Sequence, residues 1–149
     1  MREAVKQAKI AAQKDEVPVG AVIVHENRII AKAHNQVEML KDPTAHAEII
    51  AITQAANALS CKWLYDCVIY VTIEPCSMCA GALVLARIKR IYYGAADPKT
   101  GACGSVVNTV QNSQLNHQIE VSSGLMEDEC SGLISKFFKE KRGELEKID

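Results

Sequence analysis

The sequence has no long apolar run and no segment typical of a signal peptide. A membrane helix requires about 20 consecutive apolar residues, whereas the longest apolar runs, such as residues 67–73 (CVIYVTI), have the length of a strand. The N-terminus carries Arg2 and Lys6 but no continuous apolar stretch after them. These absences predict a cytoplasmic protein that does not associate with a membrane.

The chain also has little net charge and few aromatic residues. Its 17 basic and 18 acidic residues give a formal charge of −1, and aromatic residues make up 5% of the sequence. This balance excludes a global electrostatic attraction to nucleic acid, and no run of aromatics could form a stacking platform for single strands. Any binding of RNA must therefore depend on local patches, for which the basic stretches at 87–99 and 136–142 are candidates.

No internal repeat and no linker rich in glycine, proline or serine divides the chain. A length of 149 residues, with 48% hydrophobic and 23% charged residues, matches an ordinary globular domain. We therefore expect one domain over residues 1–149. Six cysteines in a chain without a secretion signal are expected to be reduced, with some of them serving a metal.

Hydrophobic periodicity predicts helices that alternate with short apolar strands. Helices are expected at residues 4–12, 45–59, 75–86 and from 126 onward, and strands at 19–24, 28–33, 67–73, 88–93 and 119–121. Thr44 is the expected N-cap of the second helix, residues 35–43 are expected to form a polar loop, and a weak helical signal lies near Val106. This alternation predicts an α/β domain in which helices cover a sheet.

Two cysteines at C-x-x-C spacing, Cys76 and Cys79, follow Pro75 where a helix is expected to begin. The spacing lets two thiolates converge on one ion, and the backbone N–H groups of a helix start favour anionic sulfurs. Alone, the motif fits a metal centre, a redox pair or half of a structural zinc site.

His46 and Glu48 lie at the start of another predicted helix. Residues two apart in an ideal helix point about 200° from each other, so they can meet at one centre only beyond the helix end. A lone histidine is usually structural, and a lone glutamate at a helix start usually complements the helix dipole. The presence of two thiols, Cys76 and Cys79, at the start of another predicted helix instead favours one site shared by both motifs.

Together the two motifs supply one imidazole and two thiolates, with no fourth ligand at a recognisable spacing. A structural zinc has four protein ligands, whereas a catalytic zinc keeps one position for water. Three ligands and a separate carboxylate therefore predict a hydrolytic site, in which zinc lowers the pKa of a water and Glu48 takes and returns the proton.

The order H-x-E followed by P-C-x-x-C is the signature of zinc nucleobase deaminases. The chain resembles one branch of them, the bacterial tRNA-specific adenosine deaminases of the cytidine/deoxycytidylate deaminase superfamily. The resemblance covers nearly the whole chain and is carried by residues 16–22 (EVPVGAV), 42–48 (DPTAHAE), 74–82 (EPCSMCAGA), 93–101 (YGAADPKTG), 115–117 (LNH) and 137–138 (FF).

This resemblance implies a three-layer α/β/α, cytidine-deaminase-like fold with a five-stranded mixed sheet. It implies a homodimer that hydrolyses a cyclic amidine C–N bond, converting adenosine to inosine at the wobble position of a tRNA anticodon. His46, Cys76 and Cys79 would bind one zinc ion per subunit, and Glu48 would shuttle protons.

The resemblance also implies contacts with the anticodon stem-loop. Asn35 would contact the base and Asp97 the nucleotide backbone. The anticodon stem would be contacted by Lys99, Phe138, Lys141 and Arg142, although Glu140 interrupts this basic tail with an acid.

Two other functions remain open at the level of the sequence. A deaminase of a free base or nucleoside, such as guanine or cytidine, would use the same zinc centre. Only the regions around Asn35 and Asp97 and the basic tail argue against it. A non-catalytic, zinc-stabilised RNA-binding module would need a fourth ligand and would have no use for Glu48.

Overall fold

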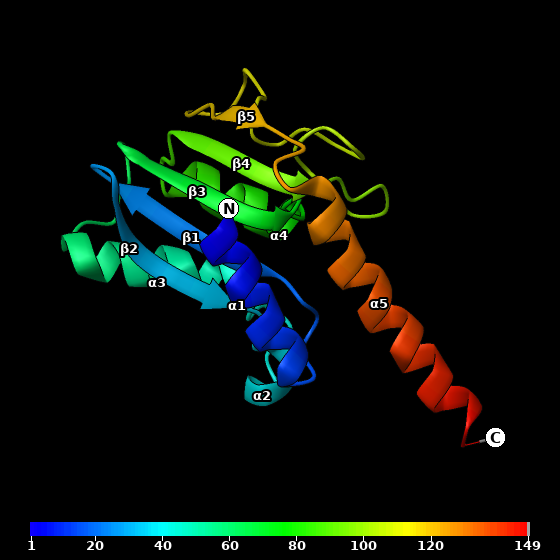
Figure 1. Cartoon of the computed structure of the whole chain (residues 1–149). Helices are drawn as coiled ribbons and strands as arrows, with labels where there is room; N and C mark the ends of the chain where they lie inside the picture. Colours follow the sequence, from blue (N-terminus) through cyan, green and yellow to red (C-terminus); the bar gives the residue numbers. More distant parts are fainter. Residues whose placement is uncertain (149) are drawn as a thin grey trace.

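A mixed five-stranded sheet lies at the centre of the computed structural model, which describes residues 1–148 (Figure 1). The strand order is β2-β1-β3-β4-β5. Strand β1 (Gly20–His25) is antiparallel to both β2 (Arg28–His34) and β3 (Cys67–Ile73). Strands β4 (Arg90–Ala95) and β5 (Glu120–Ser122) extend the sheet parallel to β3.

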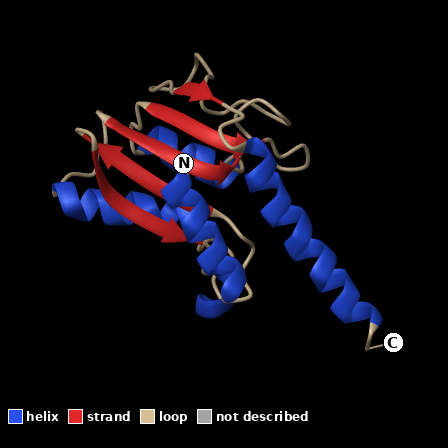
Figure 2. Ribbon diagram, in the orientation of Figure 1, coloured by secondary structure: helices blue, strands red, loops and turns tan. Residues whose placement is uncertain are grey.

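Helices cover both faces of this sheet (Figure 2). Helices α1 (Arg2–Gln13) and α5 (Glu127–Glu146) lie on one face, and α3 (Ala47–Leu59) and α4 (Ser77–Leu85) lie on the other. Helix α4 makes the crossover that parallel strands β3 and β4 require, and α5 projects beyond the sheet at its C-terminal end. The expected three-layer α/β/α fold with a five-stranded mixed sheet is confirmed.

Strands β1, β3 and β4 are largely buried because apolar side chains occupy both of their faces. Ile23, Ile69, Val71 and Ile91 have no exposed surface. Helix α1 packs so closely on the start of β1 that a Cβ atom on Gly20 would overlap the carbonyl oxygen of Ala4. Helix α1 therefore packs closely against the start of β1, at the end of the sheet where the candidate site lies.

Two predictions about the connecting segments were wrong. Residues 35–43 contain a short helix, α2 (Val37–Leu40), instead of forming only a loop. Its start is stabilised from elsewhere, because the buried Glu16 carboxylate accepts hydrogen bonds from the backbone N–H groups of Glu38 (3.0 Å) and Met39 (2.7 Å). Near Val106 the chain forms turns, because its N–H donates back to the Gly101 carbonyl (2.9 Å) and no helix develops.

Within residues 1–148, every helix is too short or too polar to cross a membrane.

Candidate metal centre and substrate cleft

The start of α3 places a histidine and a glutamate at one end of the sheet. His46 is the N-cap, with extended backbone (φ −76°, ψ 151°), and Glu48 lies in the first turn. The expected cap, Thr44, is not the N-cap, because its hydroxyl and N–H both donate to Asp42. The side chain of Asn35 takes over the capping, accepting a hydrogen bond from the N–H of Ala47 (2.8 Å).

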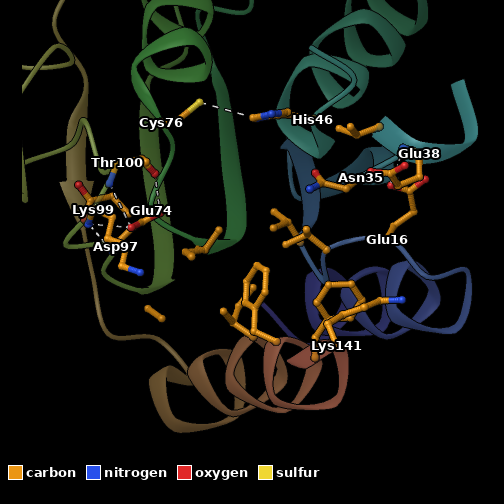
Figure 3. Close-up of a pocket in the computed structure, with 18 of the residues that line it drawn as sticks. Glu16, Asn35, Glu38, His46, Glu74, Cys76, Asp97, Lys99, Thr100 and Lys141 are labelled. Atoms are coloured by element: carbon orange, nitrogen blue, oxygen red, sulfur yellow. Dashed lines mark hydrogen bonds between the residues drawn. The ribbon is translucent and has the colours of Figure 1, made fainter. Parts of the chain in front are cut away.

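The start of α4 brings two thiols to the same place. Cys76 is the N-cap of this helix, and Cys79 is fully buried in its first turn. His46 Nδ1 lies 3.7 Å from the sulfur of Cys76 and 3.4 Å from that of Cys79. All three ligand atoms lie within 4.8 Å of one another, and Figure 3 shows Cys76 and His46 facing each other across the cleft. The two sequence motifs therefore meet at one point.

The charges of this cluster are strongly coupled. Hydrogen bonds from Cys79 and then His46 lower the pKa of Cys76 to about 4, and the same contact with Cys76 raises the pKa of Cys79. The hydrogen bond with Cys76 also raises the pKa of His46. The cluster thus holds a thiolate ready at neutral pH, which is the form that binds a metal.

Glu48 is the unsatisfied member of the site. It is 3% exposed, and its Oε1 atom has no hydrogen-bond partner among residues 1–148. Burial raises the pKa of this carboxyl. A buried carboxylate oxygen without a partner is costly, and groups in such surroundings concentrate at functional sites.

The cluster opens into a cleft of about 1500 Å³. His46, Glu48 and Cys76 line it, and so do the residues expected to contact substrate: Asn35, Asp97, Lys99, Phe138, Lys141 and Arg142. Helix α5 forms one wall, and residues 95–100 form another (Figure 3).

Comparison with known proteins places this architecture in a family. The model of the MafB19-like deaminases matches residues 1–142. A tRNA-specific adenosine deaminase from Bacillus subtilis (strain 168) is 49% identical over 142 residues, which cover 95% of this chain and 88% of that protein. One from Aquifex aeolicus (strain VF5) is 49% identical over 145 residues, covering 97% and 95%. The chain belongs to the tRNA-specific adenosine deaminase family.

Solved structures support the same family. A structure from a study of A-to-I editing by tRNA:A34 deaminases at the wobble position of transfer RNA superposes with a TM-score of 0.86. It is 46% identical, and the match covers 89% of this chain and 96% of that one. A guanine deaminase from Bacillus subtilis is more distant, with a TM-score of 0.63 and 31% identity over 95% of this chain and 90% of that one.

In this member of the tRNA-specific adenosine deaminase family, two of the expected substrate contacts already have partners within the protein. Asp97 accepts hydrogen bonds from the N–H groups of Lys99 (3.0 Å) and Thr100 (3.2 Å). Partial burial opposes ionisation of Asp97, but the hydrogen bonds from Thr100 and Lys99 lower its pKa overall. On α5, Lys141 lies 2.5 Å from Asp15 and 3.3 Å from Glu144. Lys99 and Arg142, which are both exposed, form no salt bridge with the side chains of residues 1–148.

Two buried carboxylates at the cleft were missed by sequence reasoning. Glu16 and Glu74 are each 2% exposed, and both line the cleft. Each accepts hydrogen bonds from the backbone of a distant loop, so neither is marked by a local spacing. The only available signal for Glu74 is its position directly before Pro75-Cys76.

Proposed function

We propose that this protein hydrolyses adenosine to inosine at the wobble position of a tRNA anticodon, releasing ammonia, with one zinc ion per subunit. The observation that carries the proposal is the convergence of His46, Cys76 and Cys79 beside the buried Glu48 carboxyl, whose Oε1 has no partner among residues 1–148, in a large cleft. The choice of substrate is supported by the names of the relatives at 49% identity.

The donor atoms suit zinc. Two sulfurs and one imidazole nitrogen form a ligand set that Zn²⁺ favours, and three protein ligands leave a coordination position open. The unsatisfied Oε1 of Glu48 also fits a site designed to hold a cation and a water. When bound, zinc supplies Lewis-acid activation of the attacking water.

The protein's own groups then move the protons and hold the base. Glu48 takes a proton from the attacking water at its carboxylate and returns it to the leaving amine, and the burial that raises its pKa helps it to retain that proton between the two transfers. Asn35 is oriented by the hydrogen bond from Ala47 to its Oδ1, which leaves its amide N–H groups to donate to the base. Cleft walls of Val17, Val19 and Ile73 exclude water from the base.

The size and rim of the cleft favour a polynucleotide over a free base. Small-molecule pockets measure about 300–1000 Å³, whereas this cleft measures about 1500 Å³. Lys99 and Arg142 line it and can meet phosphates, and Phe138 is exposed for stacking.

A deaminase of free guanine or cytidine is the second candidate, favoured by the similarity to the guanine deaminase from Bacillus subtilis. A non-catalytic zinc module is disfavoured. Among the described residues no fourth histidine, cysteine or carboxylate joins the cluster, and the module would give no reason to bury Glu48.

The deciding experiment measures inosine in unmodified tRNA transcripts, with guanine, cytidine and adenosine as parallel substrates. Inosine in the tRNA supports the proposal. Turnover of a free base or nucleoside, with no inosine in tRNA, favours the second candidate. Zinc binding without either activity would leave only the non-catalytic module.

We further propose that residues 1–149 act as one deaminase domain, that two copies form a homodimer, and that the protein works in the cytoplasm, where tRNA is modified. One core cluster joins residues from Val19 to Ile134, which supports a single domain. The exposed side chains of Trp63, Tyr65 and Leu85 offer apolar surface to a second copy. Size-exclusion chromatography with light scattering measures the oligomeric state directly.

A further inference from the structure

Glu74 links the metal centre to the loop on one side of the cleft. It follows β3 directly and stands two residues before Cys76. One carboxylate oxygen accepts hydrogen bonds from the N–H of Asp97 (3.2 Å) and the hydroxyl of Ser105. The other accepts from the N–H groups of Cys103 (3.0 Å) and Ser105 (3.2 Å). This carboxylate therefore fixes both ends of the segment 97–105, named here the rim loop.

Further contacts tie the rim loop to the start of α4. The N–H of Ala102 donates to the carbonyl of Pro75 (2.9 Å), and Gly101 forms a backbone bridge with Cys76. A Cβ on Gly101 would overlap the Glu74 carboxylate. The carboxylate thus packs directly against the loop backbone, where only glycine leaves room for it.

The rim loop and the loop bearing α2 form opposite sides of the cleft (Figure 3). Glu74 anchors the first, and Glu16 anchors the second through the N–H groups of Glu38 and Met39. The carboxylate of Asp97 is engaged within its own turn, including a 2.6 Å hydrogen bond from the Thr100 hydroxyl. The rim loop therefore presents its backbone and Lys99 to the cleft.

We propose that Glu74 is a positioning residue for the polynucleotide substrate. It orders the rim loop before binding, so that Lys99 and the loop backbone meet the nucleotides beside the target base. This inference rests on the proposed function. A loop that is ordered in advance loses little conformational entropy when the substrate binds, so the role of Glu74 appears in substrate affinity, and the chemical step depends on Glu48 and the zinc ligands.

The test is Glu74→Gln. Glutamine offers one acceptor oxygen, which can keep the bonds from Cys103 and Ser105, while its NH₂ group can donate to the Ser105 hydroxyl. The N–H of Asp97 then has no acceptor, and the loop loosens at the end nearest Lys99. Glu16→Gln is the matched control, because it makes the same change to a buried carboxylate on the opposite side of the cleft.

Four quantities are measured: KM and kcat on an anticodon stem-loop, zinc content, and hydrogen exchange without substrate. Glu74→Gln should raise KM by about tenfold, the effect of one buried hydrogen bond, with kcat and zinc unchanged. Exchange should accelerate in residues 97–105 and not in 37–40, and Glu16→Gln should show the reverse pattern. Ser105→Ala, which removes one donor only, should shift KM and exchange in the same direction by a smaller factor.

Parallel losses of zinc and kcat with an unchanged KM would make Glu74 a support for Cys76 and overturn the proposal. Wild-type KM and exchange in both Glu74→Gln and Ser105→Ala would overturn it as well. A wild-type protein that makes no inosine in RNA would instead refute the proposed function, whatever the exchange pattern.

Discussion

Replacing Glu48 separates the binding of the metal from catalysis. Glu48→Gln keeps the shape of the side chain but removes its ability to carry a proton. Proton transfer by a positioned group contributes about 10²–10⁴-fold to a rate, so kcat should fall by a factor in that range. Zinc content should not change, because the proposed ligands are His46, Cys76 and Cys79 and do not include Glu48.

The same substitution should stabilise the zinc-free protein. Glu48 is 3% exposed and its Oε1 has no partner among residues 1–148, and an unsatisfied buried polar group costs about 1–3 kcal/mol. The neutral amide of the glutamine removes the part of this cost that is due to charge. We take this part as about 1 kcal/mol in the free energy of unfolding. In a chain of this size that corresponds to a rise in Tm of roughly 2–4 °C.

The assay combines inosine formation at saturating anticodon stem-loop, zinc analysis, and thermal unfolding after chelation. Glu26→Gln is the control, since it makes the same charge change at an exposed position in the β1–β2 turn. Loss of zinc from Glu48→Gln would make Glu48 a ligand. A kcat within tenfold of the wild type would show that another group moves the proton.

Three further predictions concern the metal, the thiols and the basic rim. Cys76→Ala/Cys79→Ala should lose zinc and activity together, and the wild type should release zinc as pH falls, because thiolates must be deprotonated to bind; stoichiometric zinc in the double variant would contradict the ligand assignment. With zinc bound, a thiol reagent should label Cys61 alone, and chelation should add Cys76. Burial raises the pKa values of Cys67, Cys103 and Cys130 to about 11, 12 and 11, so labelling of any of them in the folded protein, detected by mass spectrometry, would count against the structure. Neutralising Lys99, Lys141 and Arg142 together should raise KM for tRNA, with zinc content unchanged. The slope of log KM against log salt concentration should fall by about 0.7–0.9 for each phosphate contact that is lost. A triple variant with wild-type kinetics would favour a free base as substrate.

The sequence was sufficient for the metal centre and the sheet because both depend on short-range patterns. H-x-E and C-x-x-C each place their side chains at one helix start. Strands β1, β3 and β4 are each a short apolar run in the sequence. Convergence of the two helix starts follows from the order of the strands, which the family resemblance supplied.

What could not be predicted depends on contacts between distant segments. The start of helix α2 is stabilised by Glu16, which lies in the segment after α1, and Asn35 replaces Thr44 in capping α3. The rim loop is shaped by Glu74, which has no periodicity or spacing that relates it to Ser105. In each case a single buried side chain decides the local backbone, and its partner is visible only in three dimensions.

His46 and Cys76 are the N-cap residues of α3 and α4, and both have extended backbone. Neither N-cap side chain makes a hydrogen bond to its own helix. Both side chains are therefore available to bind an ion, and an ion bound by both would connect the starts of the two helices. The affinity for the metal would then be coupled to the fraying of the first turns of α3 and α4. Loosening the first turn of either helix would then weaken the binding of the ion, and a bound ion would hold together two residues that are 30 positions apart in the chain.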